Sequence, residues 1–486
     1  MKRDATKAGP HREALTAFAA TVGDRHVLSE QADIAPYLSD WTNEHTGDAF
    51  CVLRPSTTRE VSKCIEICRT HSISVVPQGG RTGLVRGGMP MDGRLHAVLN
   101  LERLNRVRAI DPVSFTITAE AGVILDNARA AAAEHDLLLP LSLGAQGSCQ
   151  IGGNIATNAG GLNVLRYGMT RDLVLGLEAV LPDGRILDGL NSLRKDNRGI
   201  DINQLLIGSE GTLGVITAAT MKLVPLPEKT ETLFIGLPSF EAAVELYSNG
   251  RRMASDLISA FEVMSAPTVD FARATVADTR FPLAGKHTAY VLAELSGSAA
   301  VNLRELAEVW IGQALETGLA GDAAIAESGA QAAAMWKFRE DMVEAQTGRG
   351  LHFRSDVSVP ISRIAELAER ATANLSEALP ECDVLVYGHI GDGNLHINVL
   401  GPANASRTTN VAMLAAAEPL LYKEVERLGG SISAEHGIGR AKKDAFLAQA
   451  DPVKISLLRT IGWCLDPEGI MNPGCMFDKL GDEGGG

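Results

Sequence analysis

The spacing of apolar residues alternates between a helical period and a strand period along the first half of the chain. In residues 57–71 the apolar positions 61, 64, 65 and 68 fall on one helical face, and Thr57 or Thr58 can cap the first turn. A second helix is predicted at 125–135. Short apolar runs bounded by turn residues predict strands at 72–77, 97–101 and 116–119 and a hairpin at 176–187. The first 225 residues therefore combine strands with short helices.

Two prolines in the segment VPLPEK, at 224–229, predict a boundary between domains. Beyond this boundary, strands and helices alternate with connections that are typical of an α+β sandwich. The predicted strands are 231–237, 258–264 and 288–295, and the predicted helices are 240–253 and 302–318. A strand-rich hairpin at 384–400 closes this part, and the C-terminal stretch contains a predicted helix at 451–465.

The composition is that of a globular protein with a large core. Of the 486 residues, 45% are apolar and 21% are charged, which excludes a disordered chain and a small stapled scaffold. The 45 basic and 59 acidic residues give a net charge of −14, without a run of Lys or Arg. Nucleic acid and anionic membranes are therefore not expected as main partners. Seven sparsely spaced cysteines favour a reduced, intracellular protein over a disulfide framework.

The N-terminal segment MKRDATKAGPHREALTAF lacks the apolar core of a secretory signal. The longest apolar runs, such as 172–182, are much shorter than a membrane span. We therefore expect a cytoplasmic protein without a transmembrane segment.

Glycine is concentrated in three segments that together suggest one large cofactor. The first, at 77–90, follows a strand and can present backbone N–H groups to a phosphate. It matches neither the Walker pattern nor a GxGxxG before a helix, and a flexible surface loop is the alternative for this segment alone. The second, at 143–161, is a long run of glycines and small polar residues, and the third, at 208–214, leads into a strand. Three such segments favour a dinucleotide over a single phosphate.

The segments PQGGRTGLVRGG, GSCQIGGNIATNAGG and IGSEGTLGVIT resemble the flavin-binding domain of the vanillyl-alcohol oxidase/p-cresol methylhydroxylase flavoproteins. Together with YGHIGDGNLHINV and SAEHGIGR, they make the chain similar to the FAD-linked D-2-hydroxyacid dehydrogenases of that superfamily, of the D-2-hydroxyglutarate dehydrogenase type. The resemblance implies an α+β fold with a two-subdomain FAD-binding domain, a substrate-binding cap and a C-terminal segment that returns to the flavin. The implied boundaries are 1–44 for a lead-in, 45–227 for the FAD-binding domain, 228–430 for the cap and 431–486 for the C-terminal segment.

The resemblance implies FAD as the cofactor. A covalent link is not expected, because the first glycine segment holds no His, Cys or Tyr and the second holds only Cys149. The residues assigned to FAD binding lie in the three glycine segments and near the C-terminus. They are Pro77, Gln78, Gly79, Gly80, Arg81, Thr82, Gly83, Gly87, Ser142, Gly144, Ser148, Gly152, Gly153, Asn154, Thr157, Asn158, Gly160, Gly161, Glu210, Gly211, Gly214, Ile216 and Asn472.

Residues 384–400 form two apolar strands around a Gly-Asp-Gly-Asn turn. A four-residue loop at 391–394 would place His389 opposite His396, with their Cβ atoms about 5 Å apart. A histidine pair alone is more often packed or hydrogen-bonded than metal-binding. The resemblance, however, implies that His389, His396 and Glu435 are zinc ligands. Such a set suits catalytic zinc and also non-haem Fe(II), and we favour zinc because a flavin can take the electrons.

The resemblance also assigns the catalytic base and the substrate-binding residues. His436 matches the base of the family, and a neutral imidazole suits proton removal near pH 7. Arg339 matches an arginine that binds the substrate carboxylate, for which we expect a bidentate pair. Arg354 matches a second basic position that is often Lys in the hydroxyglutarate enzymes, whereas Val343 stands where those enzymes often have Thr. Asn398 is assigned to substrate binding as well.

The leading interpretation is oxidation of a D-2-hydroxyacid to the 2-oxoacid by hydride transfer to flavin N5, with D-2-hydroxyglutarate or D-malate as substrate. The alternatives are a D-lactate or glycolate dehydrogenase or oxidase, and a flavin-binding electron-transfer subunit without its own chemistry. The retained His436 and Glu435 argue against the last alternative. Expected partners are the small-molecule substrate and an electron acceptor such as electron-transfer flavoprotein, and a homodimer is the assembly we consider.

Overall fold

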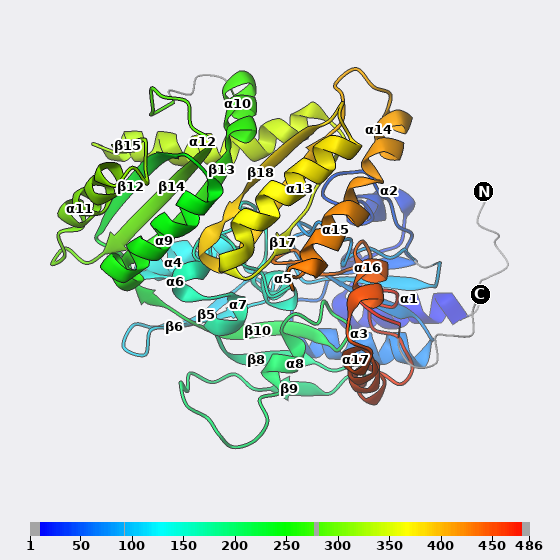
Figure 1. Ribbon diagram of the computed structural model, residues 1–486. Coiled ribbons are helices and arrows are strands. Elements are labelled where there is room, and N and C mark those ends of the chain that lie inside the picture. Colours follow the sequence, from blue (N-terminus) through cyan, green and yellow to red (C-terminus); the bar gives the residue numbers. More distant parts are fainter. Residues whose placement is uncertain (1–9, 92, 277–280, 479–486) are drawn as a thin grey trace. The chain divides into compact units, whose positions relative to one another are not determined.

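The computed structural model describes residues 10–91, 93–276 and 281–478, and the chain divides into two compact units (Figure 1). Unit 1 comprises Met1–Ala159, Met169–Leu226 and Glu435–Gly486. Unit 2 comprises Gly160–Gly168 and Pro227–Ala434. The chain therefore leaves unit 1 twice and returns to it, so that residues far apart in sequence build one unit.

The first sheet of unit 1 has the strand order β1-β2-β4-β3, in which β4 runs parallel to both β2 and β3. The strands are β1 (Val27–Leu28), β2 (Cys51–Leu53), β3 (Ser74–Gln78) and β4 (His96–Asn100). Helices α1 (Pro10–Val22) and α3 (Thr58–Thr70) bury their apolar faces in the core of this sheet. The helix predicted at 57–71 is confirmed, and Thr57 caps it by accepting a hydrogen bond from the Glu60 N–H at 3.2 Å.

The second sheet of unit 1 is antiparallel and has the strand order β5-β6-β10-β8-β9. Its strands are β5 (Val107–Asp111), β6 (Thr116–Glu120), β8 (Val174–Val180), β9 (Ile186–Asp188) and β10 (Val215–Lys222). The hairpin predicted at 176–187 is confirmed, because β8 and β9 pair with Val180 opposite Ile186. The other elements of unit 1 are short or lie around the two sheets. They are α2 (Gln31–Ile34), α4 (Leu125–Ala133), β7 (Leu137–Leu138), α5 (Ile151–Ala156), α7 (Thr170–Leu173), α8 (Asn203–Leu206), β11 (Val224–Pro225), α16 (Lys443–Gln449) and α17 (Pro452–Leu465).

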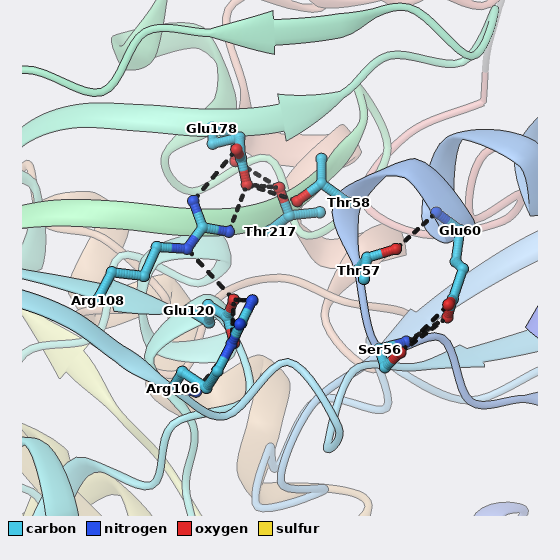
Figure 2. Close-up of polar contacts among 9 residues, drawn as sticks. All are labelled: Ser56, Thr57, Thr58, Glu60, Arg106, Arg108, Glu120, Glu178 and Thr217. Carbon is cyan, nitrogen blue, oxygen red and sulfur yellow. Dashed lines mark hydrogen bonds and ion pairs between the residues drawn. The ribbon is translucent and has the colours of Figure 1, made fainter.

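A polar network connects α3 with the second sheet inside unit 1 (Figure 2). Arg108 bridges two carboxylates, since its Nε lies 3.2 Å from Glu120 Oε1 and its Nη2 lies 2.9 Å from Glu178 Oε1. Glu178 Oε1 also accepts hydrogen bonds from Thr58 on α3, at 2.6 Å, and from Thr217 on β10, at 2.9 Å. Burial tends to raise the pKa of both glutamates, but their hydrogen bonds and arginine partners outweigh it and lower each pKa below its ordinary value.

The second glycine segment is more ordered than its composition predicts. We expected a long loop at 143–161, but helix α5 (Ile151–Ala156) lies within it. Ile151 and Ile155 are one turn apart and both buried. A Cβ on Gly152 would come within 2.5 Å of the Ala121 Cβ. Part of the glycine content therefore serves the close packing of a helix rather than a loop.

Unit 2 is built on an eight-stranded sheet with the order β15-β12-β14-β13-β18-β19-β16, and β17 pairs with β19 beside this path. All of its strand pairs are antiparallel. The strands are β12 (Lys229–Leu237), β13 (Ile258–Ser265), β14 (Ala289–Gly297), β15 (Asp322–Ile325), β16 (His352–Phe353), β17 (Val357–Ser358), β18 (Asp383–His389) and β19 (Asn394–Leu400). Both units thus combine helices with sheets, which agrees with the predicted α+β class.

Helices cover both faces of the sheet in unit 2 (Figure 1). On one face, Phe261 of β13 packs against Tyr247 and Trp310, which belong to α9 (Phe240–Ala254) and α11 (Leu303–Glu316). On the other face, Met264 of the same strand shares a core with Phe338, a residue of α12 (Gly329–Arg349). Because side chains alternate along a strand, Glu262 points to the α12 face. The remaining helices of unit 2 are α6 (Val164–Tyr167), α10 (Ala266–Thr275), α13 (Ile364–Ala378), α14 (Arg407–Leu414) and α15 (Ala417–Arg427).

Candidate active site

A cavity in unit 1 is lined by all three glycine segments and by His436. Leu101, Ala121 and Val215 add apolar wall. The lining includes these residues that were assigned to FAD from the sequence: Pro77, Gln78, Gly79, Gly80, Arg81, Thr82, Gly83, Gly87, Gly152, Gly153, Asn154, Thr157, Glu210, Gly211, Gly214 and Ile216. The structure thus brings together segments that are separated by more than a hundred positions in the sequence.

The first glycine segment is held in shape by buried side chains and close contacts. Gln78, at the end of β3, donates hydrogen bonds from Nε2 to the carbonyl oxygens of Tyr37, at 2.9 Å, and Gly88, at 3.1 Å. The bond to Gly88 ties the two ends of the loop together, and the bond to Tyr37 attaches the loop to an earlier segment. A Cβ on Gly80 would lie 2.1 Å from the Ser148 carbonyl oxygen, so only glycine fits where the first and second segments meet.

The C-terminal part of unit 1 is attached to the third glycine segment by a buried carboxylate. Glu210 accepts hydrogen bonds from the backbone N–H groups of Ile438 and Gly439, both at 2.8 Å. Burial raises the pKa of this carboxyl, and the two backbone donors only partly offset it. Arg440 donates from Nη1 to the carbonyl oxygen of Gly87, at 2.8 Å, and so fixes the same segment to the first glycine loop. The short stretch after His436 is therefore anchored on two sides of the cavity.

The residues that line the cavity suit an extended polar cofactor such as FAD. Gln150 Oε1 is buried and finds no hydrogen-bond partner among the described residues. A Cβ on Gly83 or Gly153 would meet no atom within 4 Å, so these glycines leave room inside the lining. An unsatisfied buried acceptor together with bare backbone is the arrangement expected where a bound ligand supplies the missing donor.

Seven residues that were assigned to FAD are not part of the cavity lining. Gly160 and Gly161 belong to unit 2. Asn158 accepts a hydrogen bond from the Arg171 N–H at 2.9 Å, and Asn472 donates to the carbonyl oxygens of Gly87, at 2.9 Å, and Glu210, at 2.7 Å. The remaining three are Ser142, Gly144 and Ser148. Asn472 thus connects the first and third glycine segments without lining the cavity itself.

Sequence reasoning missed several residues of the lining. Gln150 stands two residues before the glycine pair of the second segment, and a polar side chain at that place was an available signal. Leu101, Ala121 and Val215 carried no signal, because apolar residues at strand ends are common in any core.

In unit 2, the histidine hairpin has a different register from the predicted one. We expected a loop at 391–394 with His389 opposite His396, but the loop begins one residue earlier. His389 pairs with Asn394, and His396 pairs with Tyr387. The turn residue Gly393 has φ +88°, which favours glycine and places the turn there. A shift of the pairing by two keeps every side chain on its face, so both rings still lie on one side, with centroids 5.7 Å apart.

A buried glutamate connects His389 with Arg339. Glu262 Oε1 lies 2.5 Å from His389 Nδ1, and Glu262 Oε2 accepts from Arg339 Nε, at 3.2 Å, and Nη2, at 2.8 Å. Burial would raise the pKa of Glu262, but His389 and Arg339 outweigh it and lower the pKa below the ordinary value. The guanidinium of Arg339 also lies over the ring of Tyr387, 4.8 Å from its centre. No local pattern indicated Glu262, because it lies in a predominantly apolar strand.

The two histidines fit a metal site through their hydrogen bonds. His396 Nδ1 lies 3.2 Å from the Ser355 carbonyl oxygen, and this oxygen can only accept. His389 Nδ1 faces the Glu262 carboxylate in the same way. In both rings, therefore, Nδ1 carries the hydrogen and Nε2 is the nitrogen that would bind a metal, as is usual for metal-binding histidines. A ring nitrogen of each histidine lies within 4.8 Å of the other, and a carboxylate oxygen of Asp356 lies within 4.8 Å of a His396 nitrogen.

The third predicted ligand, Glu435, is the first residue of the chain after unit 2 ends. Ala434, the last residue of unit 2, donates its N–H to the Asp356 carbonyl oxygen at 3.3 Å. Glu435 therefore follows, by one peptide bond, a residue that is fixed to the segment carrying Asp356. His436 comes next and lines the cavity of unit 1.

The predicted substrate-binding residues of unit 2 differ in their surroundings. Arg339 is only 6% exposed, whereas Val343, one turn further along α12, is 42% exposed. Arg354 donates from Nε to His352 Nε2 at 2.9 Å. Burial lowers the pKa of His352 to about 4, so this ring is a neutral acceptor at pH 7. Asn398 is buried, and its Nδ2 donates to Gln346 Oε1 and the Tyr387 hydroxyl.

Comparison with solved structures and protein families agrees with this architecture. The chain matches the structure of p-cresol methylhydroxylase with substrate bound at a TM-score of 0.78 and 18% identity, over 98% of each chain. At that identity the likeness shows a common fold. Residues 49–189 match the FAD binding domain family, and residues 226–476 match the family of FAD linked oxidases, C-terminal domain. The fold and the cavity thus define an FAD-dependent oxidoreductase. Within that class, the chain belongs to the FAD-linked oxidase family, as its similarity to the D-2-hydroxyacid dehydrogenases predicted.

Curated relatives cover nearly the whole chain. D-2-hydroxyglutarate dehydrogenase of Arabidopsis thaliana is 36% identical over 94% of this chain and 80% of its own length. D-2-hydroxyglutarate dehydrogenase of Xanthomonas citri pv. viticola is 39% identical over 93% of this chain and 94% of its own length. A protein of Schizosaccharomyces pombe, provisionally named a D-lactate dehydrogenase, is 40% identical over 92% of this chain and 85% of its own length.

The expectation of a cytoplasmic protein is contradicted by these relatives. The Arabidopsis and Schizosaccharomyces proteins are both named as mitochondrial. The expectation rested on the lack of a secretory pattern in residues 1–18, which says nothing about other compartments. Within the described residues, no helix is both long and apolar enough to span a membrane.

Proposed function

We propose that the protein is an FAD- and metal-dependent dehydrogenase that oxidises a D-2-hydroxyacid to the 2-oxoacid, with D-2-hydroxyglutarate as first candidate and D-malate as second. The observation that carries the proposal is one face of the sheet in unit 2, on which both histidines lie and against which helix α12 places the buried Arg339. An α-hydroxyacid presents the two groups that such a face can bind, a hydroxyl and a carboxylate. The names of two of the relatives described above support the same substrate.

The metal site we propose consists of His389, His396 and Glu435, with zinc as the ion. Two imidazoles and one carboxylate with open positions are a common ligand set for catalytic zinc. When bound, FAD supplies the two-electron acceptor, and the metal supplies a Lewis acid beside the substrate hydroxyl.

The side chains of this protein would bind, orient and deprotonate the substrate. Arg339 holds the C1 carboxylate. Its Nε and Nη2 edge is already bound to Glu262, which leaves the edge formed by Nη1 and Nη2 for the substrate. The fixed guanidinium limits the rotation of the substrate, so that its C–H bond is held in one direction. His436 accepts the hydroxyl proton as the general base.

The proposed preference for a dicarboxylate depends on Arg354. His352, as a neutral acceptor, holds the Nε of Arg354 and thereby directs the outer edge of its guanidinium toward a second carboxylate. Asn398 is proposed to support the substrate pocket, and Val343 replaces a hydroxyl that could have contacted the distal group. We propose electron-transfer flavoprotein as the electron acceptor and a homodimer as the assembly.

D-lactate is the alternative substrate. Val343 offers no hydrogen bond to a distal carboxylate, and the Schizosaccharomyces relative is provisionally named for D-lactate. An anaerobic flavin-reduction screen with D- and L-2-hydroxyacids separates the two. D-2-hydroxyglutarate should bleach the flavin faster than D-lactate, with the L-enantiomers inactive. Faster bleaching by D-lactate would replace the dicarboxylate proposal, and bleaching by none of the acids would refute the function.

A further inference from the structure

Glu262 is a charged side chain with no solvent exposure, in the middle of strand β13 and of an apolar core. Burying a carboxylate in such surroundings is costly unless charged partners and hydrogen bonds compensate it. An apolar residue of similar volume would pack there at lower cost. The position therefore calls for a reason beyond packing.

The two carboxylate oxygens of Glu262 bind different partners. Oε2 accepts two hydrogen bonds from Arg339, which is always protonated. Oε1 lies 2.5 Å from His389 Nδ1. With Oε2 held as an acceptor by the guanidinium, Oε1 accepts the hydrogen of Nδ1. One carboxylate thereby sets the orientation of the arginine and the tautomer of the histidine.

We infer that Glu262 is a positioning residue that couples the metal-binding nitrogen of His389 to the substrate-binding guanidinium of Arg339. This inference rests on the proposed function and deepens it. Because the hydrogen is held on Nδ1, Nε2 carries the lone pair that a metal needs. Because the inner edge of Arg339 is fixed, its outer edge faces one direction only. The metal and the substrate carboxylate are thus placed by the same rigid group.

A second glutamate on the same sheet face offers a control. Glu294, on the neighbouring strand β14, accepts hydrogen bonds from the Ser259 hydroxyl, at 2.8 Å, and from the Trp336 indole, at 3.2 Å. It has a comparable strand position but is less deeply buried than Glu262, and its hydrogen-bond partners are neutral side chains instead of His389 and Arg339. Glu294→Gln thus removes a partly buried carboxyl group on the same face without changing the proposed link.

The test is the zinc affinity of the FAD-loaded protein, measured by competition with a chromogenic chelator. In Glu262→Gln, the amide oxygen should face Arg339, because the amide nitrogen cannot accept its hydrogens. The amide nitrogen then faces His389 Nδ1 and favours the tautomer with hydrogen on Nε2, which cannot bind metal. We expect zinc affinity to fall about 10- to 100-fold, the usual effect of losing such a partner. The KM for the 2-hydroxyacid should rise as well.

Glu294→Gln should keep the zinc affinity of the wild type, and Glu262→Asp, which retains the charge on a shorter arm, should lie between the wild type and Glu262→Gln. Equal zinc affinity for Glu262→Gln and Glu294→Gln would overturn the inference and leave the proposed function standing. A wild-type protein that binds no zinc would overturn the proposed metal site and the inference with it.

A measurement on the wild type covers the case in which Glu262→Gln fails to fold. In the zinc-loaded protein with ¹⁵N-labelled histidine, NMR should show His389 protonated at Nδ1 and coordinated through Nε2. Coordination through Nδ1, or a hydrogen on Nε2, would contradict the inference without any variant.

Discussion

Two buried glutamates, Glu210 in unit 1 and Glu262 in unit 2, face opposite conditions. Glu210 accepts hydrogen bonds from two backbone N–H groups at 2.8 Å and a longer one from the Cys475 thiol at 3.7 Å, and burial raises its pKa. Glu262 is bound by Arg339 and His389, and these partners lower its pKa in spite of complete burial. The donors around Glu210 only partly compensate the burial of its charge, whereas the charged partners of Glu262 outweigh it.

The two glutamates have different partners because they hold different groups in place. In unit 1, Glu210 and Arg440 attach backbone segments to one another, and these attachments shape the cavity. In unit 2, Glu262 fixes side chains that would touch a metal and a substrate. Variants in the two units should therefore fail in different ways, cofactor binding and stability in the first and metal and substrate binding in the second.

The largest effect should come from removing a proposed metal ligand in unit 2. His389→Ala or His396→Ala should lose bound zinc and lower turnover by about 10³-fold or more, because a Lewis acid contributes several kcal/mol of charge stabilisation. FAD content should stay at the wild-type level, since neither histidine lies in unit 1. Elemental analysis and flavin absorbance measure both quantities. Active wild-type enzyme without metal would contradict the expectation.

The next effect concerns His436, the proposed base, which lies in unit 1. His436→Ala should keep zinc and FAD but slow anaerobic flavin reduction by roughly 10²- to 10⁴-fold, the usual contribution of a positioned general base. Stopped-flow absorbance measures this rate. The same rate in the variant and the wild type would exclude the role.

Replacing Arg354 should reduce the preference for dicarboxylate substrates. In the wild type, D-2-hydroxyglutarate or D-malate should exceed D-lactate at least about tenfold in kcat/KM, since leaving the half-buried guanidinium of Arg354 without a carboxylate partner should cost about 1.4 kcal/mol or more. Arg354→Met should narrow this gap by weakening the dicarboxylates alone. Steady-state kinetics with the three acids test it. A gap that persists in the variant would assign the preference to another residue.

Glu210→Gln should lower stability and FAD affinity without affecting zinc. The glutamine amide can accept one of the two backbone hydrogens but not both, which leaves a buried donor unsatisfied at a cost of about 1–3 kcal/mol. Denaturant unfolding and FAD release by equilibrium dialysis measure the two losses. Because the pKa of Glu210 is raised, its contribution in the wild type is fully present below the unfolded pKa and declines as pH rises through the folded pKa. The variant should lack this decline.

The smallest effect should come from the network in Figure 2. The pKa values of Glu120 and Glu178 are lowered, so their stabilisation is present above the unfolded pKa and is lost as pH falls through the folded values. Arg108→Met should lower the free energy of unfolding at pH 7 by about 1–3 kcal/mol and flatten its acid slope. Arg198→Met, which removes an exposed ion pair with Asp196, should have no measurable effect. If the free energy of unfolding of Arg108→Met fell with acid as steeply as in the wild type, the assignment of this pH dependence to Glu120 and Glu178 would be contradicted.

Local patterns in the sequence were sufficient for part of the fold and of the site. The helical face at 57–71 and the face shared by His389 and His396 follow from periodicity, which tolerates a register error of two. The contacts of Glu262 depend on partners far away in the sequence, which no local pattern encodes. The glycine content correctly indicated a cavity. The prediction of a continuous loop at 143–161 was wrong, because glycine occurs both in loops and where a helix packs closely.

The most direct test of the proposed chemistry is anaerobic titration of the metal-stripped, FAD-loaded wild type with D-2-hydroxyglutarate, followed by addition of zinc. The flavin should stay oxidised with substrate alone and should bleach when zinc is restored, while L-2-hydroxyglutarate leaves it oxidised throughout. Complete bleaching before zinc is added would contradict a metal-dependent oxidation, and no bleaching after zinc is added would contradict the substrate.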